Sequence, residues 1–116
     1  MSGYIDDGYT KTETIPARPG RHTAVEITYR PCTARERYRI YEGKPSFNDL
    51  TGDQQFDRQA KVLADKVKAW DVKNGEADVP LKLESIQCLD FYLFEAMVAL
   101  VAGHKTVADL EAALKN

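Results

Sequence analysis

The most apolar stretch of the chain, residues 91–103, constrains the fold more than any other feature. It reads FYLFEAMVALVAG and carries a single charged residue, Glu95. The stretch is too short to span a bilayer. Apolar residues recur at helical spacing from Leu83 onward, which predicts a helix over residues 83–102 that stops at Gly103. One face of this predicted helix carries Ile86, Leu89, Leu93, Ala96, Met97 and Leu100.

The other side of the same predicted helix is apolar as well. A helix that is apolar nearly all round is either central to the core or covered by a partner. The first interpretation makes it a fully buried central helix. The second places part of this face against a partner helix or another copy of the chain. On that second interpretation the candidate partner-binding residues are Phe91, Phe94, Val98 and Val101.

The N-terminal part of the chain has the pattern of a β-hairpin. Residues 1–9 are polar and are expected to form a mobile tail. Residues 10–17 predict an edge strand, and Pro19 with Gly20 predicts the turn. The second strand alternates and ends at Pro31. Its apolar face, which must pack on helices because a hairpin alone is marginal, consists of Val25, Ile27 and Tyr29.

Three further helices are predicted. Thr33 and Glu36 form a capping box that opens a short helix, which Gly43 and Pro45 end. Residues 53–70 predict an amphipathic helix, and Thr106 caps a last short one whose inner face carries Leu110 and Leu114. The inner face of the 53–70 helix consists of Phe56, Ala60, Leu63, Ala64 and Val67.

These elements predict an α+β fold. With 116 residues, of which 43% are hydrophobic, the chain suits one domain with a modest core. We expect residues 10–116 to form a single, mainly helical domain of about four helices with an N-terminal β-hairpin.

The segment WDVKNGEADVPLKL, residues 70–83, predicts a structural joint between two helices. Trp70, the only tryptophan, would close the amphipathic helix and pack over its neighbour. Asn74 and Gly75 permit a tight type I′ turn that would pair residues 71–72 with residues 77–79. Pro80 would then set the entry to the next helix.

The sequence contains no recognisable motif for catalysis, metal binding or phosphate binding. The two cysteines and two histidines have no metal-ligand spacing, and no phosphate-binding glycine motif occurs. Cys88 lies in an apolar helical pattern, which predicts a buried, reduced thiol. We therefore expect no catalytic residues, no metal, no cofactor and no enzymatic activity. No signal peptide is evident, so a cytoplasmic, non-membrane protein is expected.

The arginines all lie in the first half of the chain. Arg35, Arg37 and Arg39, with Tyr38 and Tyr41, could contact nucleic acid through phosphates and stacking. However, Arg37 points away from the face that Arg35 and Arg39 share on a helix, and the net charge of the chain is −2. A solvated basic surface is the favoured interpretation, and nucleic-acid binding is not expected.

The order of these segments resembles a known family. A strand ends in ITYRP, a helix ends in AW, and an apolar helix ends in ALVAGHK. This arrangement is similar to small tail proteins of tailed bacteriophages and prophages, in particular to tail assembly chaperone-like proteins encoded near the tape measure gene. It covers about residues 23–105. The matching residues are Tyr29, Arg30, Pro31, Trp70, Gly75, Val79, Pro80, Leu89 and Gly103.

The resemblance implies a non-enzymatic assembly factor. Such a protein would bind the helical tape measure protein in the host cytoplasm while the tail tube polymerises around it. Recognition would be of the helix-in-groove kind, with several copies on each partner molecule and possible self-association. Two other classes stay open: a virion structural protein, such as a ring-forming tail-completion or head–tail connector protein, and a small DNA-binding regulator.

Overall fold

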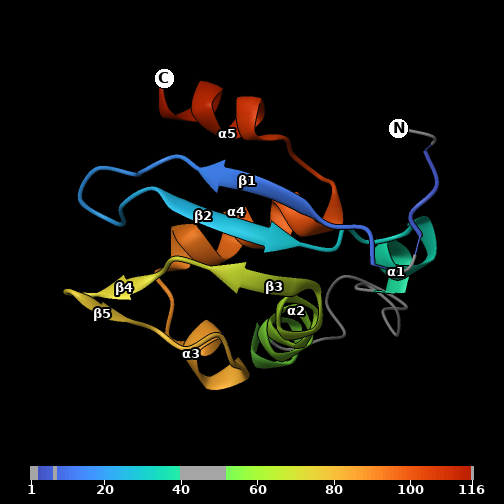
Figure 1. The fold of residues 1–116 in the computed structure, drawn as a ribbon, viewed down its shortest axis with the longest axis horizontal. Helices are drawn as coiled ribbons and strands as arrows, with labels where there is room; N and C mark the ends of the chain where they lie inside the picture. The colour runs from blue at the N-terminus through green and yellow to red at the C-terminus, as the bar shows by residue number, and fades with distance from the viewer. Residues whose placement is uncertain (1–2, 7, 40–51, 116) are drawn as a thin grey trace.

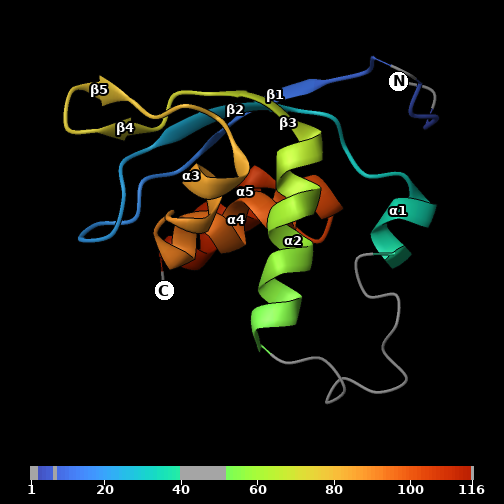
Figure 2. The same ribbon diagram turned by 90° about the horizontal axis from the view of Figure 1, so that it is seen from below.

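The computed structural model describes residues 3–6, 8–39 and 52–115, without the side chain of Arg39. A three-stranded antiparallel sheet in the order β1-β2-β3 forms one layer. Its strands are β1 (Lys11–Ile15), β2 (Val25–Tyr29) and β3 (Val67–Trp70). The helices α2, α4 and α5 lie beneath one face of this sheet, as Figures 1 and 2 show.

The described residues contain five helices rather than the predicted four or so. They are α1 (Ala34–Arg39), α2 (Gly52–Lys66), α3 (Leu83–Gln87), α4 (Phe91–Ala102) and α5 (Val107–Leu114). The predicted α+β class and the N-terminal hairpin are confirmed. In Figures 1 and 2, α1 lies at the edge of the molecule, whereas α4 crosses under the sheet.

The hairpin forms as its alternating pattern predicts. Gly20 adopts a φ of +79° in the connecting loop, a value that favours glycine. The register pairs Ile15 with Val25 and Lys11 with Tyr29, so the apolar side chains share one face. On that face Tyr29 donates its hydroxyl to the Glu13 carboxylate, and burial, followed by this bond, raises the pKa of Tyr29. The side chains of this face that are buried against the helices are Ile15, Val25, Ile27 and Tyr29.

The predicted helix over residues 53–70 ends earlier than expected. α2 stops at Lys66, and Val67–Trp70 becomes the third strand of the sheet. Val67 is buried as predicted, but it pairs with Tyr29, while Trp70 pairs with Ile27. Ala64, expected on the inner face, is exposed. Backbone pairing with β2 therefore overrides the local helical pattern at this end.

The predicted helix over residues 83–102 is two helices. α3 ends at Gln87 and α4 begins at Phe91. The Asp90 carboxylate accepts hydrogen bonds from the backbone N–H groups of Tyr92 at 3.0 Å and Leu93 at 3.3 Å, so Asp90 caps a new helix. Cys88 consequently lies at the break, where it is exposed rather than buried as predicted.

Three of the four candidate partner-binding residues belong to the core. Phe94 is 3% exposed, Val98 7% and Val101 1%. Only Phe91 lies on the surface, at 60% exposure. The sheet and α2 cover the second apolar side of α4, and Phe94 stacks against Phe56 with ring centroids 4.8 Å apart. A partner surface that uses all four residues is therefore wrong for this structure, and the central-helix interpretation holds for three of them.

The segment after Trp70 forms a small arm from β4 (Lys73–Asn74) and β5 (Ala77–Asp78). A hairpin was predicted here, but its register and turn type differ from the prediction. Lys73 pairs with Asp78, and Gly75 alone has a positive φ of +65°, which is the pattern of a type II′ turn rather than type I′. Figure 2 shows the arm projecting from the body of the molecule.

Trp70 does not close the amphipathic helix as predicted, because α2 ends at Lys66 and Trp70 is the last residue of β3. It contacts the base of the arm instead. Its side chain is half-buried, and the indole Nε1–H donates to the Val79 carbonyl at 2.8 Å. This bond ties the base of the arm to β3. Pro80 follows directly and precedes α3, whose N-cap residue is Lys82.

The predicted capping box of Thr33 with Glu36 is confirmed. Thr106 caps the last helix as predicted, and the structure shows that it does so in a second capping box with Asp109. Gly43, Pro45 and Tyr41 lie outside the described residues. Residues 3–6 and 8–9 form no helix or strand, and the mobility of the N-terminal tail stays a prediction.

Replacing Trp70 by Ala should lower the free energy of unfolding by about 3 kcal/mol, because it removes a large packed ring and the bond to Val79. Trp70→Phe should cost about 1 kcal/mol, since most of the ring packing remains. Urea denaturation followed by circular dichroism measures both. Equal losses in the two variants would contradict a packing role for the ring.

Candidate functional site

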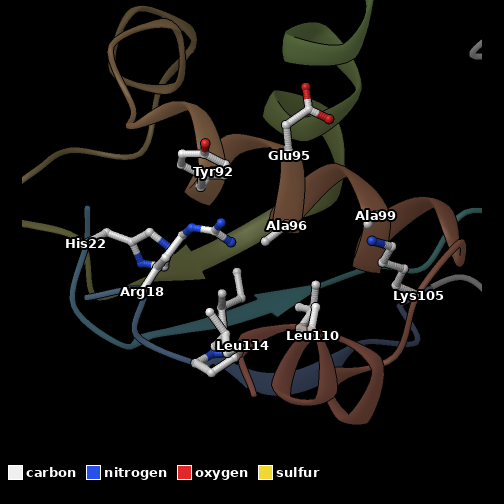
Figure 3. Close-up of a pocket in the computed structure, with 12 residues that line it drawn as sticks. Arg18, His22, Tyr92, Glu95, Ala96, Ala99, Lys105, Leu110 and Leu114 are labelled. Carbon is white, nitrogen blue, oxygen red and sulfur yellow. The ribbon is translucent and has the colours of Figure 1, made fainter. Parts of the chain in front are cut away.

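One of the hollows of the described structure is a groove between α4 and α5, which we call the α4–α5 groove. It has a volume of about 240 Å³. In Figure 3 the groove runs between α4 on one side and α5 on the other. Its apolar lining comes mainly from Ile15 of β1, Ala96 and Ala99 of α4, and Leu110, Ala113 and Leu114 of α5.

The groove exists because α5 packs loosely on the rest of the fold. Gly103 ends α4 with a φ of +81°, and the Thr106–Asp109 capping box starts α5 soon afterwards. None of the residues of α5 is fully buried, and Leu114 remains 37% exposed. Since Ala96 and Ala99 present only methyl groups, apolar surface on both helices stays open to a ligand.

Charged side chains occupy the two ends of the groove. Figure 3 shows Arg18 and His22 of the β1–β2 loop at one end, Lys105 at the other and Glu95 on the α4 side. The Arg18 guanidinium lies 3.9 Å from the centre of the Tyr92 ring, a cation–π contact. The groove therefore combines an apolar floor with polar ends.

An exposed aromatic pair adjoins the groove at the start of α4. The rings of Phe91 and Tyr92 meet edge to face, with centroids 5.4 Å apart, and Tyr92 is 39% exposed. Arg21 lies 5.0 Å from the Tyr92 ring and forms an ion pair with Asp90 at 2.9 Å. Aromatic and arginine side chains are enriched among the residues that dominate protein–protein binding. This end of α4 therefore has the composition of a protein contact.

Sequence reasoning found only part of this groove. It placed Leu110 and Leu114, which line the groove, on the inner face of the last helix. It also predicted Phe91 as a partner-binding residue, which lies next to Tyr92 but does not line the groove. It missed Arg18 and Tyr92, because the loop and α4 meet only through the tertiary fold. The spacing of Ala96 and Ala99, three apart on one helix face, was the available signal for a shallow surface.

A polar cluster elsewhere connects α1 to the end of α2. The Lys66 side chain, only 7% exposed, forms an ion pair with Glu36 and lies 3.7 Å from the Asp65 carboxylate. Burial tends to raise the pKa of Glu36, but the bonds from Lys66 and Thr33 outweigh it and lower the pKa to about 2. Burial also raises the pKa of the neighbouring Cys32 thiol, against the opposing effect of Lys66. The cluster thus holds α1 against the end of α2.

The two histidines make separate contacts. His22 donates from Nδ1 to the Thr23 carbonyl at 2.7 Å. His104 accepts at Nδ1 from the Arg37 guanidinium at 2.8 Å, and burial followed by the charge of Arg37 lowers its pKa. In the predicted arginine and tyrosine set, Arg37 therefore contacts His104, and Tyr38 is 80% exposed. The Arg39 side chain and Tyr41 lie outside the described residues.

Within the described ranges, no group of three or more His, Cys, Asp or Glu side chains could hold a metal ion. The same residues contain no helix that is long and apolar enough to cross a membrane.

Replacing Glu36 by Gln should destabilise the fold at neutral pH. A carboxyl whose folded pKa lies below its unfolded value adds stability that is fully present above the unfolded pKa and is lost as the pH falls. The difference between the native chain and Glu36→Gln in urea midpoint should therefore shrink between about pH 5 and pH 2. Glu111→Gln, an exposed change on α5, is the control. A difference of the same size at pH 7 and pH 2 would contradict this role for Glu36.

Comparisons with known proteins identify no relative: no family model, no curated protein and no solved structure matches this chain.

Proposed function

We propose that this protein is a non-enzymatic, tail assembly chaperone-like factor that binds a helical segment of a phage tape measure protein in the α4–α5 groove. The order of sequence segments described above supports the phage assignment. The groove supports the helix-binding part of the proposal. On this proposal the protein acts in the cytoplasm of the bacterial host.

The observation that carries the proposal is the open apolar floor between α4 and α5. Helix-in-groove recognition requires apolar surface on two supporting elements, between which the side chains of a partner helix can insert. Here Ala96 and Ala99 provide one side, and Leu110 and Leu114 provide the other. Most of α4 is buried in the core, so its second apolar face is not available to a partner. On this proposal the groove binds the partner helix instead.

The size of the groove fits a chaperone that acts in many copies. A volume of about 240 Å³ receives only a few side chains of a partner helix. The affinity of each copy would then be modest, and coverage of a long partner would depend on many successive sites. Phe91, exposed beside Tyr92 at one end of the groove, would extend the contact along the partner.

A bulky side chain that fills the groove should weaken partner binding without unfolding the chain. Ala113 is exposed and lines the groove, whereas Ala108 is exposed on the same helix and does not. We expect Ala113→Trp to weaken binding by roughly tenfold or more, the cost of blocking one central contact. Ala108→Trp, the matched control, should bind as the native chain does.

The measurement is co-expression with the largest helical protein encoded beside this one, followed by a pull-down. The native chain and Ala108→Trp should keep that protein soluble and co-purify with it, and Ala113→Trp should not. If the neighbouring protein stays insoluble with the native chain, and this protein runs alone as a large ring in gel filtration, the chaperone proposal is wrong and a virion structural role replaces it.

A further inference from the structure

We infer that the segment bound in the α4–α5 groove is an acidic amphipathic helix, with carboxylates on both sides of its apolar contact residues. The inference depends on the proposed helix-binding role of the groove. It adds the chemistry of the partner, which the shape of the groove alone does not specify.

The charges that line the groove are mainly positive. Arg18 and Lys105 contribute two cations, and Glu95 is the one acidic residue of the lining. Among the residues that the structure describes, none of these three side chains forms an ion pair, although the charge of Lys105 also acts on the Asp109 carboxylate. The chain as a whole has a net charge of −2, so this concentration of cations is a local property of the groove. A partner with carboxylates would complement it.

The geometry of Arg18 favours an acidic partner in particular. Its guanidinium lies over the Tyr92 ring, with Cζ 3.9 Å from the ring centre, and this cation–π contact does not neutralise its charge. The stacked side chain has already lost much of its rotamer freedom, so less entropy is lost when a carboxylate binds. Arg21, which also approaches Tyr92, differs because Asp90 already neutralises it.

The positions of the cations predict where the partner carboxylates lie. Figure 3 places Arg18 and Lys105 at opposite ends of the groove, with the apolar floor between them. A helix lying along this floor would present large apolar side chains to Ala96 and Ala99. Its carboxylates would lie about one turn away on either side, because residues three or four apart share a helix face. A lysine-flanked helix of the same apolar content would meet both cations and be rejected.

Two labelled model peptides test this inference by fluorescence anisotropy. Both are amphipathic helices with the same leucine and phenylalanine stripe; one carries glutamate on either side of the stripe and the other carries lysine. The glutamate peptide should bind the native chain and weaken as salt rises, since exposed charges are screened. The lysine peptide should bind at least about tenfold more weakly, the effect of 1.4 kcal/mol.

Three substitutions that each replace a charged side chain by glutamine should change the affinity for the glutamate peptide in different directions. Arg18→Gln and Lys105→Gln should each weaken binding about threefold, as expected for exposed charge pairs. Glu95→Gln should strengthen it by a smaller factor, because it removes the one acidic residue of the lining, whose carboxylate points away from α5 in Figure 3. Arg18→Lys should recover only part of the affinity relative to Arg18→Gln, because it restores the charge but not the planar guanidinium held on Tyr92. Lys61→Gln, an exposed change on α2 outside the groove, is the matched control.

The outcomes separate this inference from the proposed function. Equal binding of the two peptides, or no opposite effect of Glu95→Gln, overturns the acidic-partner inference. If Ala113→Trp still abolishes binding in that case, helix binding in the groove stands. If neither peptide binds, the acidic-helix inference is also overturned, while the co-expression experiment decides the function independently.

Discussion

The burial of α4 beneath the sheet is the constraint on which the rest of the structure depends. Met97 is fully buried, and Phe94 and Val101 are nearly so, which places the most apolar helix of the chain at the centre of the core. Most of the apolar residues that were predicted to contact a partner are therefore buried inside the folded protein. What remains accessible on α4 is its exposed N-terminal end, at Phe91 and Tyr92, together with the edge that its alanines present to α5.

Much of the fold could be predicted from local patterns. The hairpin follows from alternation and from Gly20. The caps at Thr33 and Thr106 were correctly placed because the residues of each cap lie within one turn of each other. The end of α2 could not be predicted, because Val67 satisfies the apolar position of either a helix or a strand. The outcome is decided by pairing with Tyr29, which is distant in sequence.

The break between α3 and α4 shows a second limit of local reasoning. The apolar spacing continues through Leu89, and only the capping bonds of Asp90 reveal that a new helix begins there. The groove was likewise only partly predictable, since Arg18 and Ala113 both line it although they lie far apart in the sequence. Small residues on α4 and a loosely held last helix are properties of packing, which no single segment displays.

The bond between the Trp70 indole and the Val79 carbonyl has a practical consequence. Trp70 is the single tryptophan of the chain and lies where the β4–β5 arm leaves the sheet. Tryptophan fluorescence therefore reports on this one position, and the emission wavelength depends on how far the indole is exposed to water. The molecule carries its own optical probe of the arm, and a ligand held in the distant α4–α5 groove would leave that signal unchanged unless the arm itself moved.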